Sequence, residues 1–274
     1  MSVYKYGICE WLMPVTGPAA ITLAGEMGFD GVQILDSGGE SQNFPMNNPR
    51  VQDIYKKAAD KAGIDIQTYQ LQSLVRSGKV KSPQDSQGFR DAVLAIKKGI
   101  KVCRAIGIKN LMMENFFDSF IYNDYDLENT GALLNVAGEL TGEAGIQLIY
   151  ESFVSVEKTL RLYEMANRSF KLCYDTLNPQ KYDFGDPLDE LRRYPLAIID
   201  HIHFKDTAPN YTCSALLGRG SSQFKRSVEL LREIGYTGWL VTENYYCEGA
   251  FGRENDPFES IQTDLDTMRE RFRS

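Results

Sequence analysis

One local pattern recurs five times along the 274-residue chain and constrains its fold. An amphipathic segment closes on a glycine, and a short apolar run follows within a few residues. The five copies are EMGFDGVQIL, KAGIDIQTYQ, AIGIKNLMME, EAGIQLIYES and EIGYTGWLVTE, with glycines at Gly28, Gly63, Gly107, Gly145 and Gly235. The residue that follows a helix often takes a positive φ, which glycine adopts readily. The pattern therefore predicts helices that each lead directly into a strand.

Three further apolar runs, near residues 4–9, 170–175 and 198–204, raise the number of predicted strands to eight. Eight strands that alternate with helices in a chain of this length favour a (β/α)8 TIM barrel. A doubly wound open sheet is the alternative, but no glycine-rich phosphate turn follows the first strand. We predict one TIM-barrel domain over residues 1–274, because no linker or low-complexity segment divides the chain.

Two helical stripes are expected to face the core, because their apolar residues recur every three or four positions. The first contains Phe89, Val93, Ile96, Ile100, Cys103 and Ile106, and the second contains Phe258, Ile261, Leu265, Met268 and Phe272.

Composition limits the class of partner. The net charge is −7 and no basic tract is present, which argues against nucleic acid as a partner. The five cysteines include no C-x-x-C pair, so we expect neither a disulfide framework nor a thiolate zinc cage. The N-terminus resembles no signal peptide and no run is long enough to span a membrane. We expect a soluble, cytoplasmic protein.

Four potential metal ligands, Glu151, Asp175, His203 and Glu243, each lie at the end of a separate predicted strand. Taken singly, Glu151 and Asp175 are explained as helix caps and the histidine as a core residue bonded to backbone, whereas no helix directly follows Glu243 for it to cap. In a parallel barrel, however, the strand ends meet at one rim, where these carboxylates repel one another without a cation. We therefore predict a divalent metal site. The oxygen-rich set suits Mn²⁺ or Mg²⁺, with Zn²⁺, Co²⁺ and Fe²⁺ left open.

The chain resembles the xylose-isomerase-like sugar phosphate isomerase/epimerase superfamily, which includes ketose 3-epimerases, hydroxypyruvate isomerase and inosose dehydratase. The resemblance extends from GFDGVQIL through HIHFKD to IGYTGWLVTEN. HIHFKD is similar to the family's H-x-H-x-K-D segment, whose second histidine binds metal, and this selects His203. Glu151, Asp175 and Glu243 match the family's other ligands in order.

The resemblance implies a metal-dependent isomerase or epimerase that acts on a small ketose or ketose phosphate through a cis-enediolate. Glu151 and Glu243 would then act as acid and base on opposite faces of the sugar. A lyase that dehydrates a keto-inositol or sugar acid uses the same residues and is the alternative enzyme. A sugar-binding protein without turnover is a third hypothesis. A nuclease of the endonuclease IV type needs more than the two histidines present.

The resemblance also points to four substrate-binding candidates, Glu157, Asn178, Lys205 and Arg219, each of which has a structural explanation. Glu157 is expected on the following helix, where it would be solvated, and Asn178 stands where many relatives carry histidine. Lys205 reaches either a substrate oxygen or one of the carboxylates of Asp175 and Asp206. Arg219, in the sequence LGRG, either holds an anionic substrate at the mouth or is a plain turn residue. A homodimer or homotetramer is expected from the relatives.

Overall fold

The computed structural model describes residues 3–36, 44–208 and 215–273, and strands β1 to β8 form a closed parallel barrel in chain order. The predicted (β/α)8 fold is therefore confirmed. The strands are β1 (Tyr4–Cys9), β2 (Gly31–Leu35), β3 (Asp65–Gln70), β4 (Asn110–Glu114), β5 (Gln147–Glu151), β6 (Phe170–Asp175), β7 (Ile199–Phe204) and β8 (Gly238–Thr242).

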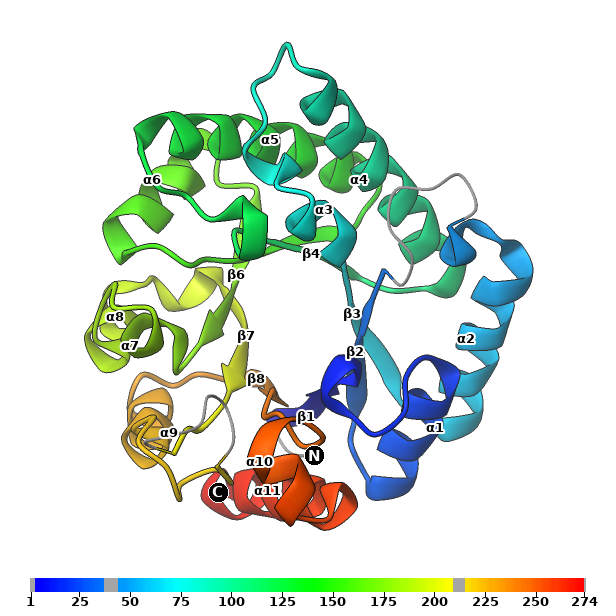
Figure 1. The fold of residues 1–274 in the computed structure, drawn as a ribbon, viewed down its shortest axis with the longest axis vertical. Coiled ribbons are helices and arrows are strands. Elements are labelled where there is room, and N and C mark those ends of the chain that lie inside the picture. The colour runs from blue at the N-terminus through cyan, green and yellow to red at the C-terminus, as the bar shows by residue number, and fades with distance from the viewer. Residues whose placement is uncertain (1–2, 37–43, 209–214, 274) are drawn as a thin grey trace. The chain divides into compact units, whose positions relative to one another are not determined.

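Helices separate the strands along the chain (Figure 1). They are α1 (Pro18–Met27), α2 (Pro49–Ala62), α3 (Gln72–Arg76), α4 (Gln87–Ile106), α5 (Asp124–Glu143), α6 (Val156–Met165), α7 (Asn178–Lys181), α8 (Pro187–Arg193), α9 (Phe224–Glu233), α10 (Gly249–Glu254) and α11 (Pro257–Arg271). The five glycines of the repeated pattern follow helix ends and have φ between 68° and 96°, as predicted. Within the described ranges, no helix is long and apolar enough to cross a membrane.

The barrel residues fall into two compact units. The first contains residues 3–33, 58–65 and, among the described positions, 173–273. In this unit β8 pairs with both β1 and β7, and the register places His203 beside Val241. Phe204 is buried between α9 and α11, with its ring 5.0 Å from that of Phe224 and 6.0 Å from that of Phe272. Because successive strand residues face opposite sides, His203 faces the barrel interior.

The second unit contains residues 34–57, apart from 37–43, and residues 66–172. Strand β4 pairs with β3 and β5, and α4 and α5 run side by side (Figure 1). The predicted face of α4 is buried at Phe89, Ile96, Ile100, Cys103 and Ile106 and half-buried at Val93.

The predicted stripe of α11, in the first unit, is correct from Ile261 onward. Phe258 is an exception, with 46% of its surface exposed. It lies in the first turn, directly after the Asp256 cap, so the packed face of α11 begins one turn later.

The cysteines at the described positions carry no disulfide, in line with the prediction. Cys9, Cys103 and Cys173 are buried and Cys247 is exposed, and none of these four is in a disulfide. Cys213 lies outside the described residues.

Gly31 at the start of β2 tests the packing of the first unit. A Cβ atom there would lie 2.6 Å from Trp239 Cη2 and 2.8 Å from the carbonyl oxygen of Asp65. Gly31→Ala should therefore lower the free energy of unfolding by roughly 1–3 kcal/mol in urea denaturation. Gly142→Ala in α5 is the matched control, because its Cβ meets no atom within 4 Å. It should leave stability unchanged or raise it by up to about 1 kcal/mol. Equal effects from the two changes would contradict this account of the packing.

Candidate active site

Three of the four predicted ligands converge in the first unit. Asp175 ends β6, His203 is the penultimate residue of β7, and Glu243 directly follows β8. Each offers a ligand atom within 4.8 Å of the others. All three are buried, with exposed fractions of 4%, 0% and 8%. The parallel strands therefore deliver two carboxylates and an imidazole to one place, as the sequence predicted.

Lys205 balances the two carboxylates. Its ammonium nitrogen lies 2.5 Å from Glu243 Oε2 and 3.2 Å from Asp175 Oδ2. Of the alternatives considered for Lys205, the structure shows the pairing with Asp175, and the contact with Glu243 is an addition. Burial alone would raise the pKa of Glu243, but the charges of Lys205 and His203 outweigh it and hold that pKa well below its usual range. Glu243 is therefore ionised at neutral pH.

His203 is held between two oxygen atoms. Its Nδ1 lies 3.1 Å from Glu243 Oε2, and its Nε2 lies 3.0 Å from the side-chain oxygen of Gln33 in β2. Trp11 donates its indole N–H to Glu243 Oε1 over 3.2 Å. Gln33 was not singled out from the sequence, although a glutamine inside the apolar run GVQIL is a signal for an inward polar contact. These contacts fix the orientation of both the imidazole and the carboxylate.

Asp175 bonds the backbone at the start of α7 and also lies beside the other two candidate ligands. Its Oδ1 accepts backbone N–H groups from Leu177 at 2.8 Å and Asn178 at 2.7 Å, which caps the short helix α7. Its Oδ2 is buried and has the Lys205 ammonium 3.2 Å away as an ion-pair partner. Two buried carboxylates and an imidazole together form a donor set that suits a divalent cation. The residues present therefore fit a metal ion.

Glu151 belongs to the second unit, where it ends β5 and is 2% exposed. It pairs in register with Glu114 at the end of β4, which is 5% exposed. Paired residues on neighbouring parallel strands point to the same side, so two carboxylates are buried next to each other here too. Such a pair is unfavourable unless a proton or a cation reduces the repulsion.

The other substrate-binding candidates occupy different surroundings. Glu157 lies in the first turn of α6 and is exposed, as expected for a residue on that helix. Asn178 is buried at the start of α7. Arg219 is exposed in the loop after β7. Asp206 shapes that loop, because its Oδ2 accepts the N–H groups of Gly218 at 2.8 Å and Gly220 at 3.0 Å.

A buried network that the sequence did not reveal joins this loop to β8. Asp264 in α11 accepts hydrogen bonds from Leu217 N–H at 2.8 Å, Asn244 Nδ2 at 2.7 Å and Tyr246 OH at 2.8 Å. Asn244 in turn accepts the backbone N–H of Asp206 over 2.7 Å. Burial raises the pKa of Asp264 to about 6. The network fixes the residue that follows Glu243 and the loop that carries Arg219.

Known proteins resemble the chain over most of its length. Residues 21–271 match the family described as xylose isomerase-like TIM barrel. The 2-epi-5-epi-valiolone 7-phosphate 2-epimerase of Actinoplanes sp. is 31% identical over 250 residues, which cover 89% of this chain and 88% of that protein.

Two solved structures share the fold at 15% identity. D-psicose 3-epimerase from Clostridium cellulolyticum H10, solved with D-tagatose, has a TM-score of 0.77 and covers 98% of this chain and 100% of its own. The IolI protein with a binding zinc atom has a TM-score of 0.78 and covers 98% of each chain. The chain belongs to the xylose isomerase-like TIM barrel family. It is an enzyme of the isomerase/epimerase group.

A separate cavity of about 220 Å³ lies in the second unit and contains none of the predicted ligands. Asp36, which directly follows β2, lines it together with Phe44, Leu71 and Ser73. The Asp36 carboxyl group accepts hydrogen bonds from the backbone N–H and the hydroxyl of Ser73. Burial outweighs these bonds and raises the pKa of Asp36 to about 7. Ionised Asp36 is therefore unfavourable in the folded protein.

The raised pKa of Asp36 predicts a pH-dependent stability. Protonated Asp36 contributes fully to the free energy of unfolding below pH 3.8, its ordinary pKa. This contribution is lost as the pH rises through about 7, the pKa in the folded protein. Asp36→Asn mimics the protonated form and should match the wild type at pH 4. At pH 8 its free energy of unfolding should be higher by roughly 2–4 kcal/mol. Urea denaturation across this pH range measures the difference.

Asp91→Asn is the matched control for that measurement. Asp91 lines the same cavity, but its pKa is lowered by the side chains of Gln87 and Lys79. The control should give no stabilisation at pH 8. A pH-independent effect of Asp36→Asn would contradict the assignment.

Proposed function

We propose that the protein is a divalent-metal-dependent epimerase that inverts a carbon beside the carbonyl of a polyhydroxylated ketone phosphate. The observation that carries the proposal is the convergence of Asp175, His203 and Glu243, which are all buried and each offer a ligand atom within 4.8 Å of the others. The relative from Actinoplanes, which covers 89% of this chain, is by its name a 2-epimerase of 2-epi-5-epi-valiolone 7-phosphate, and this supports the choice of epimerisation and of a phosphorylated substrate.

Asp175, His203 and Glu243 would hold the ion, with Glu151 at the end of β5 as the proposed fourth ligand. Three carboxylates and one imidazole favour Mn²⁺ or Mg²⁺, although the structure of IolI contains zinc. A divalent ion bound there would act as a Lewis acid toward the carbonyl and neighbouring hydroxyl oxygens of the substrate.

The residues of the chain supply the proton transfers. Glu243 is ionised, and Trp11 and His203 orient its two oxygens, so it is prepared to accept the proton from the carbon beside the carbonyl. Inversion requires that a proton return to the opposite face of the same carbon, and Glu151 is the proposed donor. Lys205, whose ammonium contacts Glu243, would stabilise negative charge that develops on the substrate oxygens.

Arg219 is proposed to bind the phosphate. The guanidinium is exposed at the loop that follows β7, and in a TIM barrel the loops after the strands line the active-site face. Asp206 and the two glycines beside Arg219 fix the loop. A guanidinium can donate two parallel hydrogen bonds to a phosphate, which gives it geometric selectivity as well as charge.

The proposal predicts metal-dependent proton exchange. Metal-free protein mixed with keto sugar phosphates in deuterated water should exchange the proton beside the carbonyl only after Mn²⁺ is added, and NMR detects the label. Glu243→Gln should reduce the exchange rate by roughly 10²–10⁴-fold, because the base is lost. Glu248→Gln makes the same chemical change at an exposed residue and should exchange at the wild-type rate.

Three outcomes would overturn or redirect this assignment. Near-normal exchange by Glu243→Gln would remove Glu243 from the chemistry. A product lighter by one water would identify a lyase, and bound metal without exchange of any keto sugar would favour a non-catalytic binding protein.

The phosphate assignment makes its own prediction. Arg219→Gln should raise KM for a phosphorylated substrate by roughly 10–100-fold, because one or two charge-assisted hydrogen bonds are lost. The KM for the same substrate without phosphate should stay constant. Arg232→Gln is the control, since Arg232 lies in the last turn of α9, at the end of the barrel opposite the active-site loops. An equal increase in KM for the phosphorylated and the unphosphorylated substrate would show that Arg219 does not bind the phosphate.

A further inference from the structure

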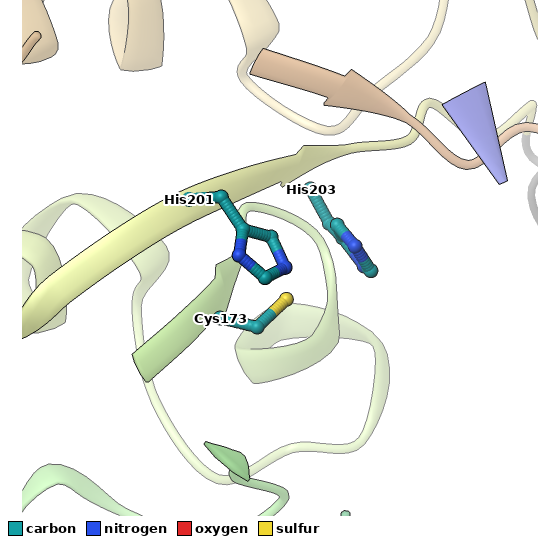
Figure 2. A group of neighbouring side chains, drawn as sticks. All are labelled: Cys173, His201 and His203. Atoms are coloured by element: carbon teal, nitrogen blue, oxygen red, sulfur yellow. The ribbon is translucent and has the colours of Figure 1, made fainter. Parts of the chain in front are cut away.

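A second group of potential ligands lies one layer below the rim in the first unit. Cys173 precedes Asp175 by two residues in β6, and His201 precedes His203 by two residues in β7. Because residues two apart face the same side of a strand, the deeper pair repeats the rim pair. Figure 2 shows the sulfur of Cys173 and the ring of His201 turned toward each other, with His203 beside them.

We propose that Cys173, His201 and His203 form a binding site for a soft divalent cation such as Zn²⁺ or Cd²⁺. One ligand atom from each lies within 4.8 Å of the other two. Around a tetrahedral zinc, with bonds of about 2.0–2.3 Å, such atoms lie roughly 3.5 Å apart. Side-chain rotations that shift the atoms by about 1 Å therefore close the site. Cys173 would bind as the thiolate and release its proton to solvent.

An outer carboxylate orients His201 in the way that is common for metal-bound histidines. Asp200 Oδ2 lies 3.0 Å from His201 Nδ1. When Nδ1 donates to this carboxylate, the lone pair of the neutral ring is on Nε2, which is then the nitrogen able to bind a cation. The two rings of His201 and His203 have centroids 5.2 Å apart and are tilted by 45°. Their separation allows both to reach one ion.

The deeper site and the rim site share His203 but differ in chemistry. A thiolate with two imidazoles selects Zn²⁺ or Cd²⁺, whereas the carboxylates of Asp175 and Glu243 suit Mn²⁺ or Mg²⁺. Both ring nitrogens of His203 already face oxygen atoms, those of Glu243 and Gln33. His203 therefore ligates an ion only by giving up one of these contacts, and we expect it to serve one ion at a time. If the rim holds the catalytic ion, as proposed above, a soft cation below it inhibits by withdrawing His203.

Titration of metal-free protein with Cd²⁺ tests the site by ultraviolet difference absorbance, because only a thiolate-bound cadmium gives the sulfur-to-metal charge-transfer band. The wild type should develop the band to an end point of one Cd²⁺ per chain. Cys173→Ser should abolish it. His201→Ala should weaken Cd²⁺ binding at least tenfold. Cys9→Ser and Cys103→Ser should both keep the band.

The cysteine controls distinguish the alternatives. Cys9 is grouped with His203 and Glu243, so loss of the band in Cys9→Ser alone would place cadmium there and overturn the proposal. Cys103 is buried on α4 in the second unit and tests for non-specific thiol binding. Absence of the band in the wild type would also overturn the proposal.

Competition with Mn²⁺ separates this inference from the proposed function. Mn²⁺ released from loaded protein by Cd²⁺ is counted by the electron paramagnetic resonance signal of the free ion. In the wild type, one Cd²⁺ should release one Mn²⁺, and in Cys173→Ser at least tenfold more Cd²⁺ should be needed. Failure of the wild type to bind Mn²⁺ would count against the proposed function, while the charge-transfer band still tests the deeper site. Cd²⁺ and Mn²⁺ bound together would refute the sharing of His203.

Discussion

The ion pairing of Lys205 with Asp175 and Glu243 is the interaction on which the site in the first unit depends. Two carboxylates buried to 4% and 8% exposure carry a large desolvation penalty, and a single buried ammonium bridges them at 3.2 Å and 2.5 Å. Buried charges persist only where partners are close and well oriented. Lys205 is thus one cation shared by two carboxylates. The divalent cation proposed above would add a second positive charge beside the same two carboxylates.

Rigid surroundings keep this arrangement in place. Glu243 directly follows β8, and Asn244, the next residue, is bonded to Asp264 in α11 and to the backbone of Asp206. The same two acidic residues also accept backbone N–H groups from residues 217–222 in the loop after β7. Asp264 and Asp206 thus determine the positions of Asn244, the residue next to Glu243, and of the loop that carries Arg219. A side chain or loop whose position is fixed by buried hydrogen bonds needs less reorganisation when a ligand binds.

Much of this architecture could be predicted from the sequence because it follows from local rules. Glycine after a helix, strand periodicity and acidic residues at strand ends are each visible within a few residues, and together they gave the barrel and three converging ligands. Gln33 and Asp264 could not be assigned in the same way, because their partners are separated from them by 170 and 47 residues. Each interrupts an apolar pattern, which signals a buried polar contact but does not identify its partner. Phe258 was misplaced because periodicity does not show where packing against a helix begins.

The alternation of strand residues has a consequence for ion selectivity. In β6 the inward donor changes from the soft thiol of Cys173 in the deeper layer to the hard carboxylate of Asp175 at the rim, whereas β7 offers an imidazole at both levels, His201 and His203. Oxygen donors next to Lys205 define the upper layer and a thiol next to two imidazoles defines the lower one. His203 belongs to both, because its ring lies beside that of His201 and also contacts Glu243. Under the two proposals above, the position of that single ring would link the kind of ion bound to the availability of Glu243 as the base.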